Sequence, residues 1–240
     1  MKPRMFTFEN RRIKTWNPLI GCLHHCIYCY ARKWAKRLKR LCEYCYKFVP
    51  HLHVERLSQS KIPGGDLPVF VCDMSDLFGN WIPREWIKMV LSAAKTKSRR
   101  CGTTFLFLTK NPAGYFLFLD QFDEHTILGA TIETDYVELS VRVSGAPSVR
   151  SRIYHMIQLR KARPDLKLFV SIEPILEFTN PLSFARKLEP IKPDFVFVGY
   201  DNYNNNLVEP RLEEVKELIE ELEKFTEVRP KTLRKAWHER

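Results

Sequence analysis

Short apolar runs alternate with amphipathic stretches along this chain, and each run ends in polar residues. Five runs are rich in Val, Ile and Phe, which is typical of strands buried on both faces of a parallel sheet. They occupy 67–76, 103–112, 126–135, 166–175 and 194–202. With the segment "IKTWNPLIG" at 13–21 as the first strand, the pattern predicts six strands.

Helices are predicted between the strands, after Pro83, Pro147, Pro181 and Pro210, because proline is tolerated in a first helical turn. The last of them has one apolar face, as expected for packing on a core: Leu212, Val215, Leu218, Ile219, Leu222 and Phe225. Alternating strands and helices imply right-handed parallel crossovers. The predicted fold is therefore α/β, a partial (β/α)6 TIM-like barrel with parallel strands.

A chain of 240 residues is long enough for one large domain. We expect a single domain over 1–240, with a core at 13–200 and a C-terminal helix and tail at 206–240. The first residues contain no apolar stretch of a signal peptide, and no run is long enough to span a membrane. The expected location is the cytoplasm, with no membrane partner.

The net charge of +11 comes from 39 Lys and Arg against 28 Asp and Glu. Such a charge favours anionic partners, nucleic acid above all. A solvated surface is the alternative explanation. Abundant Lys, Glu and Arg with only three Gln are also what the chain of a thermophile would show.

Three cysteines, Cys22, Cys26 and Cys29, form a CxxxCxxC motif directly after the first predicted strand. Three thiolates on one loop can hold three irons of a [4Fe-4S] cluster and leave the fourth iron without a protein ligand. A structural zinc site would need a fourth ligand. A small chelating molecule can therefore bind at the open corner of such a cluster.

With Tyr28 before the third cysteine, the motif resembles that of the radical S-adenosylmethionine (SAM) superfamily. The resemblance implies that SAM chelates the open iron and is cleaved reductively to methionine and a 5'-deoxyadenosyl radical. It also implies an electron donor of the ferredoxin or flavodoxin kind. Similarity to spore photoproduct lyase is confined to "CIYCY".

Further segments resemble a phage and prokaryotic family of radical SAM-like proteins whose substrates are mostly unassigned. They are "TWNPLIGC", "HVERL", "FVCDMSDLF", "FLTKNP", "LGATIE" and "FVSIEP", in this order over about 13–200. Three departures concern the site: "DMSD" replaces the superfamily's GGE, "GYDNYNNN" replaces a Gly-Gly-Glu-Ser segment, and a C-terminal Lys-Gln-Trp-Gly motif is missing. The resemblance therefore does not carry a substrate.

Polar residues follow each apolar run, and in parallel α/β sheets ligands sit at these carboxyl ends of strands. For any single residue, strand capping or loop solvation is an equal alternative. The candidates for binding SAM are Tyr28, Asp73, Ser75, Asp76, Thr109, Thr131, Glu133, Ser171 and Gly199. The candidates for catalysis are Glu173 and Lys110.

The segment "ARKWAKRLKRLCEYC" is predicted to form one helix with Trp34, Leu38, Leu41 and Cys45 on one face. Its basic side chains are candidates for contacts with phosphates, although charge runs are often only solvated. They are Arg32, Lys33, Lys36, Arg37, Lys39 and Arg40, below called the basic segment.

A second pair of cysteines, Cys42 and Cys45, is followed by His51 and His53 at a spacing suited to a Cys2His2 zinc site. His53 also matches the "HxERL" segment of the family above. A reversible disulfide or simple packing are the alternatives. Cys72 and Cys101 are predicted to be small core residues.

Three functions are compatible with these features. The first is a radical SAM enzyme that modifies or repairs tRNA, other RNA or DNA, in which aromatics such as those of "GYDNY" stack a base. The second is a radical SAM enzyme acting on a peptide or small metabolite, which leaves the charge unexplained. The third is a non-catalytic, metal-bound nucleic-acid-binding protein, which does not need the polar strand ends.

Overall fold

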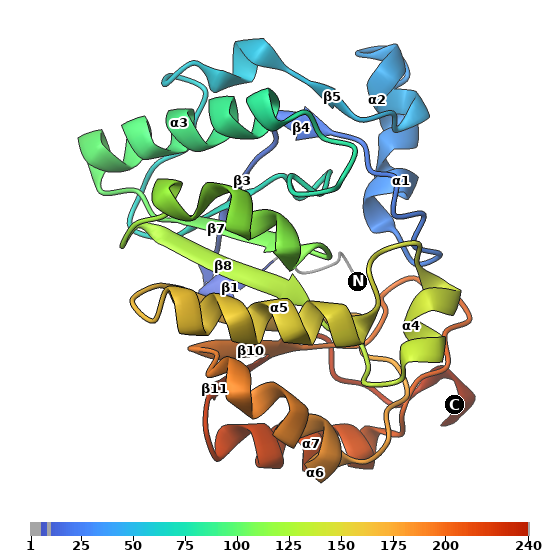
Figure 1. Ribbon diagram of the computed structural model, residues 1–240. Helices are drawn as coiled ribbons and strands as arrows, with labels where there is room; N and C mark the ends of the chain where they lie inside the picture. Colours follow the sequence, from blue (N-terminus) through green and yellow to red (C-terminus); the bar gives the residue numbers. More distant parts are fainter. Residues whose placement is uncertain (1–5, 9–10, 240) are drawn as a thin grey trace.

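The computed structural model describes residues 6–8 and 11–239, so the outermost bounds of the expected domain, at 1–5 and 240, lie outside the described residues. Seven strands form one parallel sheet that is an open half-barrel (Figure 1), and their spatial order follows the chain. The strands are β3 (Lys14–Trp16), β6 (Val69–Val71), β7 (Phe105–Thr109), β8 (Thr126–Thr131), β9 (Lys167–Ile172), β10 (Phe195–Val198) and β11 (Glu227–Pro230). The predicted fold class is confirmed.

All four helices predicted after prolines are present and cover the outer face of the sheet. They are α3 (Arg84–Cys101), α5 (Val149–Ala162), α6 (Pro181–Leu188) and α7 (Leu212–Glu223). Further elements are α4 (Val137–Val143), the 3-10 segments η2 (Val54–Leu57), η3 (Pro112–Gln121), η4 (Glu189–Ile191) and η5 (Trp237–Glu239), and the antiparallel pairs β1 (Thr7–Phe8) with β2 (Arg11–Arg12) and β4 (Leu19–Ile20) with β5 (His51–Leu52).

The sheet has one strand more than the sequence predicts. β11 follows α7 and pairs in parallel with β10 at the edge of the sheet, where its side chains are exposed or half-buried. Its sequence, EVRP, contains no apolar run, because an edge strand needs only one covered side. The predicted first strand is divided: β3 joins the main sheet and β4 pairs with β5.

The concave face of the half-barrel is filled by aromatic side chains toward the start of the strands. Phe169 on β9 and Phe195 and Phe197 on β10 pack there with Phe6, whose ring stacks on Phe197 at a centroid distance of 4.4 Å. Residues two and four positions further along the same strands share this face, because side chains alternate in a strand. Ser171 and Glu173, at the end of β9, therefore face the concave side above an aromatic layer.

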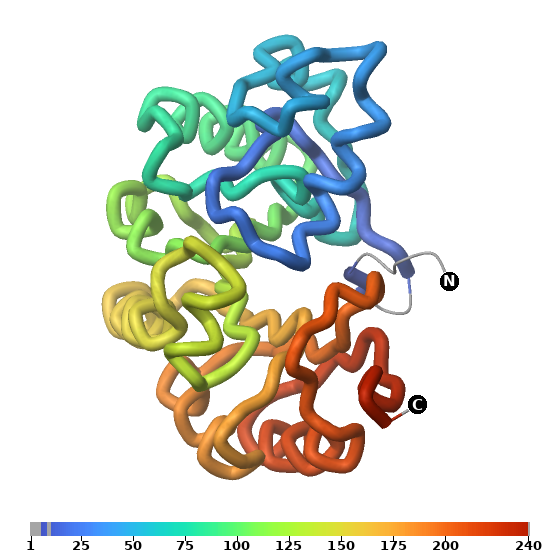
Figure 2. Tube along the Cα trace, turned by 90° about the vertical axis from the view of Figure 1, so that its right-hand side faces the viewer, coloured from blue at the N-terminus to red at the C-terminus, as the bar shows by residue number. Residues whose placement is uncertain are grey.

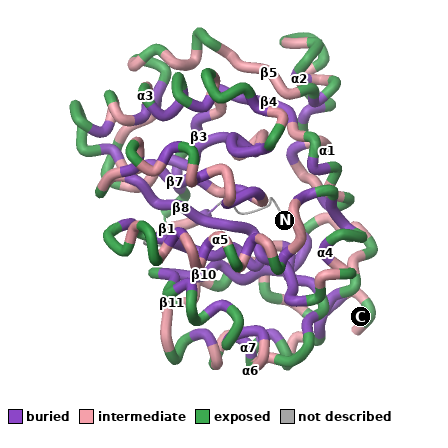
Figure 3. Tube along the Cα trace, viewed as in Figure 1, coloured by how far each residue is buried: buried purple, intermediate pink, exposed green. Residues whose placement is uncertain are grey.

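The convex face carries the main core, between the sheet and its helices. Leu128, Val170 and Val196 belong to one buried cluster there with Val90 of α3, and the buried residues of α7 are part of the same cluster. Figure 3 shows buried positions along the strands and exposed positions on the outer sides of the helices. The apolar face predicted for α7 is thus a packing face.

The segment that carries the basic residues is not one helix, so this prediction is wrong. It forms α1 (Tyr30–Ala35), the 3-10 turn η1 (Lys36–Leu38) and α2 (Glu43–Lys47). Cys42 is extended, and its sulfur accepts a hydrogen bond from the amide of Cys45 (3.2 Å), so it caps a second helix. The expected common face does not exist, since Leu41 is 81% exposed while Cys45 is buried.

Of the two cysteines expected in the core, Cys72 is buried, but Cys101 ends α3 and is exposed, so that expectation is wrong for Cys101. Among the described residues, none of the helices has the length and apolar composition needed to cross a membrane.

Candidate functional site

The loop that carries CxxxCxxC, residues 21–29, lies where the strands of the half-barrel end, a side of the molecule called the mouth below. Figure 2 faces this side and shows the loop together with α4 and the segment after β10. Gly21 donates its amide hydrogen to the carbonyl of Met74 (3.0 Å), and Ser75 Oγ donates to the carbonyl of Gly21. The start of the loop is thus fixed to the end of β6.

The rest of the loop is fixed by α4 and the residues after it. Ile27 donates its amide to the carbonyl of Val143 (3.0 Å), and Gly145 donates to the carbonyl of His24 (2.6 Å). Cys26 Sγ lies 3.1 Å from Ser144 Oγ. Because α4 contains no long apolar run, no pattern along the sequence indicates this support.

The three thiols are free and partly exposed. Cys29 caps α1, its sulfur accepting from the amide of Arg32 (3.4 Å), and Arg32 donates to the carbonyl of Cys22 (3.0 Å). Burial raises the pKa of Cys22 and of Cys29, and the neighbouring Cys26 raises both further. Iron bound to these thiols would reverse the shift, because a coordinated thiol is deprotonated.

The donor set fits a [4Fe-4S] cluster with an open iron: three free thiols on one fixed loop, accessible from the mouth. The one group of Cys and His side chains gathered tightly enough for a single ion, within the described part of the chain, lies elsewhere, at Cys42, Cys45, His51 and His53. Among the described residues, the motif cysteines belong to no group gathered that tightly.

A buried ionic network links the cysteine loop to the ends of β7 and β8. Tyr28 and Lys110 both donate hydrogen bonds to Glu133, and Lys110 Nζ lies 2.7 Å from the hydroxyl of Tyr28. Arg152 of α5 donates to the second oxygen of Glu133 and to the carbonyl of Thr131 (2.7 Å). Both Glu133 and Arg152 are fully buried.

Glu133 is ionised despite its burial. Burial alone would raise the pKa of Glu133, but the Arg152 guanidinium and the Lys110 ammonium outweigh it and lower this pKa well below its ordinary value. The carboxylate therefore fixes Lys110 and, through its hydroxyl, Tyr28. Arg152 is not among the predicted site residues, although its place between Val149 and Met156 on the buried face of a helix is the signal that could have found it.

Asp76 joins the cysteine loop to two strand ends. Its carboxylate accepts hydrogen bonds from Thr109 Oγ1 (2.6 Å) and from the amides of Lys110 (2.9 Å) and Phe78 (3.1 Å), and lies 2.7 Å from His24 Nε2. Burial opposes ionisation of Asp76, but the bond to His24 and the other donors lower its pKa. Asp76 and Thr109 thus make their contacts within the protein, and His24, inside the motif, is a positioning residue that the sequence analysis missed.

Asp73 lies at the end of β6, next to the loop. Asn17 donates to its carboxylate, and Tyr30 donates to its backbone carbonyl (2.6 Å). Burial raises the pKa of Asp73 even though Asn17 and Tyr30 stabilise its charge. Asp73 and Ser75 thus stand beside the cysteines, where the resemblance places the SAM amino group.

Three further candidates lie on β8, on β9 and directly after β10. Thr131 and Ser171 are buried and stand opposite each other in the register of β8 and β9. Gly199 follows β10, and a Cβ there would lie 3.2 Å from Lys231 Cβ and 3.6 Å from Glu173 Oε1. The strand ends thus bring Thr131, Ser171 and Glu173 to the same edge of the concave face.

Glu173 and Lys110, the predicted catalytic pair, lie in separate networks. Lys231, which follows β11, donates to Glu173 (2.5 Å), whereas Lys110 contacts Glu133. The peptide between Glu173 and Pro174 is cis. Lys231 lies in the predicted tail, where no local pattern indicates a place in the site.

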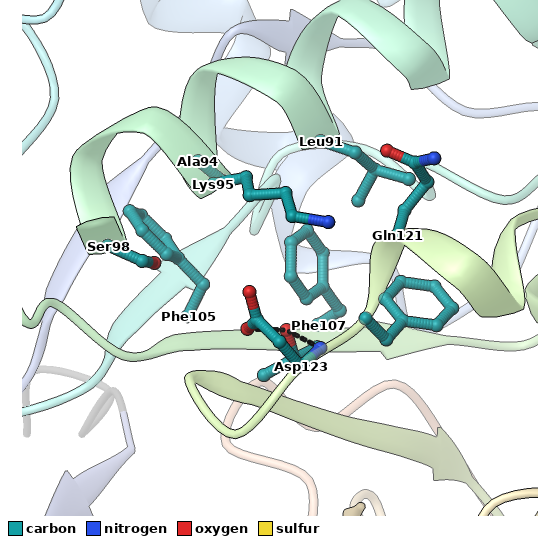
Figure 4. Close-up of a pocket in the computed structure, with 10 residues that line it drawn as sticks. Leu91, Ala94, Lys95, Ser98, Phe105, Phe107, Gln121 and Asp123 are labelled. Carbon is teal, nitrogen blue, oxygen red and sulfur yellow. Dashed lines mark hydrogen bonds between the residues drawn. The ribbon is translucent and has the colours of Figure 1, made fainter.

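A small hollow on the convex side is unrelated to the mouth (Figure 4). It lies between α3, the end of η3 and the starts of β7 and β8, and Lys95, Gln121 and Asp123 are among its lining residues. Because the strands begin here, the hollow lies at the end of the sheet opposite the cysteines.

Three solved structures illustrate the fold that this chain shares. A mutant of spore photoproduct lyase is 14% identical over 89% of this chain and 75% of its own, with a TM-score of 0.63. SuiB of Streptococcus suis, bound to SAM, is 10% identical over 92% of this chain and 52% of its own, with a TM-score of 0.56. Methylornithine synthase PylB is 12% identical over 92% of this chain and 65% of its own, with a TM-score of 0.52. At these identities the likeness establishes the fold alone.

The family itself follows from the sequence. The chain belongs to the family described as "Protein of unknown function (DUF5131)", whose model matches residues 10–206. The match includes the cysteine loop and β3 to β10. No curated protein sequence matches the chain significantly.

Proposed function

We propose that the chain is a radical SAM enzyme in which Cys22, Cys26 and Cys29 hold a [4Fe-4S] cluster. The observation that carries this proposal is the position of three free thiols on one fixed loop above the polar strand ends of the half-barrel. When bound and reduced, such a cluster supplies one electron to the sulfonium of SAM, which gives methionine and a 5'-deoxyadenosyl radical. A ferredoxin- or flavodoxin-like protein of the cytoplasm is the proposed donor.

In this proposal the strand ends orient SAM. Asp73, beside the loop, accepts from the SAM ammonium, and the hydroxyls of Thr131 and Ser171 face its ribose. Gly199 leaves room beside Glu173, because a side chain there would meet Lys231. Ser75, Asp76, Thr109 and Glu133 make their hydrogen bonds within the protein, where they hold Gly21 of the cysteine loop and Lys110.

Glu173 is the proposed residue for contact with substrate. Its carboxylate is partly exposed at the mouth and is held by Lys231, whose side chain is 8% exposed. This pairing keeps Glu173 in place to accept a hydrogen bond. Lys110, predicted to be catalytic, acts in this proposal through Tyr28, whose hydroxyl it contacts.

A nucleic acid, RNA or DNA, is the substrate class that the charge favours. Five of the six residues of the basic segment are exposed, and Lys33 reaches the segment after β10, where it contacts Asn205 and lies 5.3 Å from the centre of the Tyr203 ring. The basic segment thus adjoins the mouth. A structure of spore photoproduct lyase with AdoMet and a dinucleoside spore photoproduct (TM-score 0.53, 15% identity) has the same fold. A peptide or small metabolite is the alternative substrate, and SuiB has been solved with a precursor peptide.

The cluster and its chemistry are tested together. Anaerobically reconstituted protein is incubated with SAM and dithionite, and 5'-deoxyadenosine is measured by liquid chromatography. We expect cluster absorbance and 5'-deoxyadenosine in the wild type and in Cys101→Ser, and neither in Cys26→Ala. The exposed Cys101 controls for loss of a thiol. If the wild-type chain formed the cluster but never cleaved SAM, the proposed enzyme would be refuted and the non-catalytic, metal-bound protein would be favoured instead.

A further inference from the structure

A second set of metal-ligating side chains lies outside the cysteine loop. Cys42 caps α2, Cys45 lies within it, and His51 and His53 lie on and directly after β5, which Figure 1 shows beside α2. Residues 51 and 53 share one face because side chains alternate in a strand. The four ligand atoms all lie within 4.8 Å of one another.

The separations of the atoms suit one tetrahedral ion. His51 Nε2 lies 3.4 Å from both sulfurs, and His53 Nε2 lies 3.2 Å from Cys45 Sγ. With Zn–S of about 2.3 Å and Zn–N of about 2.0–2.1 Å, tetrahedral angles put sulfur and nitrogen roughly 3.5 Å apart. These three sulfur–nitrogen separations are already close to that value.

The two imidazoles are oriented as zinc ligands are. His51 Nδ1 lies 2.7 Å from the carbonyl of Val49, which can only accept, so Nδ1 carries the hydrogen. His53 Nδ1 lies 2.9 Å from a carboxylate oxygen of Glu55. Metal-bound histidines usually donate their second ring N–H in this way, to a carbonyl or a carboxylate.

This orientation leaves two unprotonated nitrogens facing each other. The Nε2 atoms of His51 and His53 are 2.9 Å apart, so two neutral rings would oppose their lone pairs. A cation between the nitrogens and the sulfurs removes the conflict.

We propose that Cys42, Cys45, His51 and His53 bind one zinc ion. Binding releases the two thiol protons to solvent, so Zn²⁺ and two thiolates form a neutral centre. All four ligands come from the protein, which is typical of structural zinc and leaves no position for a substrate.

The zinc ion fastens the part of the chain on which the basic segment rests. Arg32 lies 4.9 Å from the ring centre of Phe48, and Lys36 and Lys39 lie 5.5 and 5.7 Å from that of Tyr46. Both rings belong to the span between the ligands Cys45 and His51. The ion therefore holds the basic side chains at the edge of the mouth, and its presence does not depend on the proposed radical chemistry.

The experiment measures zinc in the full-length chain, purified anaerobically without added metal. By plasma mass spectrometry we expect about one zinc per chain in the wild type and in the combined variant Cys22→Ala, Cys26→Ala, Cys29→Ala. We expect loss of zinc in Cys42→Ser and retention in His51→Cys, which replaces one ligand by another. Cys101→Ser is the matched control for removal of a thiol.

Cobalt supplies a test that needs no variant. Metal-stripped wild type titrated with Co²⁺ is expected to show intense tetrahedral ligand-field bands and a thiolate charge-transfer band at one equivalent, both displaced by Zn²⁺. The proposal is overturned if zinc is lost when Cys22, Cys26 and Cys29 are replaced and is kept in Cys42→Ser. It is also overturned if Co²⁺ gives only the weak spectrum of an octahedral ion, or if anaerobic protein contains a Cys42–Cys45 disulfide.

Discussion

The two cysteine regions differ in how many ligands the fold supplies, and in the functions proposed above this number separates a reactive metal from a structural one. The loop at 21–29 brings three thiols to the mouth, where polar strand ends face them. The Cys2His2 cluster supplies four ligands within its own segment. An open iron can bind a small molecule, whereas a closed zinc site can only hold chain segments together.

The two regions also touch. Gly21 begins the cysteine loop with a φ of +98°, and a Cβ there would lie 2.3 Å from the carbonyl carbon of Val49. Val49 in turn accepts the hydrogen bond that orients His51. A change in the structural site can therefore reach the reactive one through the backbone, and the predictions below separate the two.

The largest effects are expected from replacing one cysteine in each of the two regions and comparing the two variants. Cys26→Ala should lower 5'-deoxyadenosine formation by about a thousandfold or more, because no radical forms without the cluster, while leaving the melting temperature close to that of the wild type. Cys42→Ser should lower the melting temperature and keep most of the activity at low temperature. Calorimetry and the SAM cleavage assay check both. The opposite assignment of the two phenotypes would refute the comparison.

Glu133 fixes Tyr28, Lys110 and Arg152 by hydrogen bonds, and removal of its charge should have the next largest effect. Glu133→Gln leaves the buried Arg152 and the partly buried Lys110 without a counter-charge, so we expect a loss of about 3–5 kcal/mol in the free energy of unfolding. Glu138→Gln, an exposed change on α4, should cost less than about 0.5 kcal/mol. Denaturant titration measures both. Equal small effects would show that the network is not buried as described.

Gly21 tests the contact between the two regions. Gly21→Ala forces a side chain into the backbone at Val49 and adds the strain of a positive φ, so a loss above about 2 kcal/mol is expected, together with weaker zinc retention. Gly102, with a φ of +63° and open space around it, is the matched control. Gly102→Ala should cost about 1 kcal/mol and leave zinc unchanged. If Gly21→Ala left the stability unaltered, the close contact between the two regions at Gly21 and Val49 would be contradicted.

Acid should weaken the Glu133 network in a defined range. The folded-state pKa of Glu133 lies below its ordinary value of 4.5, so the stabilisation is complete above about pH 4.5 and is lost as pH falls toward the folded pKa. Over that range one proton contributes a slope of up to about 1.4 kcal/mol per pH unit. Unfolding curves of wild type and Glu133→Gln between pH 3 and 6 should converge as the pH falls. Parallel curves would contradict the lowered pKa.

The strands, the helices and the cysteine motif could be predicted because each depends on local pattern. The runs that form β6 to β10 are apolar, and prolines mark the helix starts. β11 could not be predicted, because an edge strand with exposed Glu227 has no such pattern. The basic segment is predicted as one helix because helical spacing says nothing of the turn that Cys42 makes when it caps α2.

The site was only partly predictable, because local pattern identifies the strand ends but not their distant partners. Strand ends identify Glu133 and Glu173, but their partners come from distant elements: Arg152 from α5 and Lys231 from the end of the chain. A charged residue on an apolar helix face indicates a buried partner without identifying it. The pairing of distant charges is decided by the packing of the fold, which spacing along the sequence does not encode.

The basic segment is expected to give the smallest effect, because exposed charges act singly and through screened fields. Arg37→Glu with Arg40→Glu should reduce the salt dependence of tRNA or DNA binding by roughly 1.4–1.8 units of slope, since each phosphate contact contributes about 0.7–0.9. Arg99→Glu with Arg100→Glu, the same change at exposed positions of α3, should change it less. Fluorescence anisotropy over a salt series measures the slopes. Equal slopes in the two variants would mean that binding follows net charge alone, and the basic segment would then be only a solvated surface beside a zinc site.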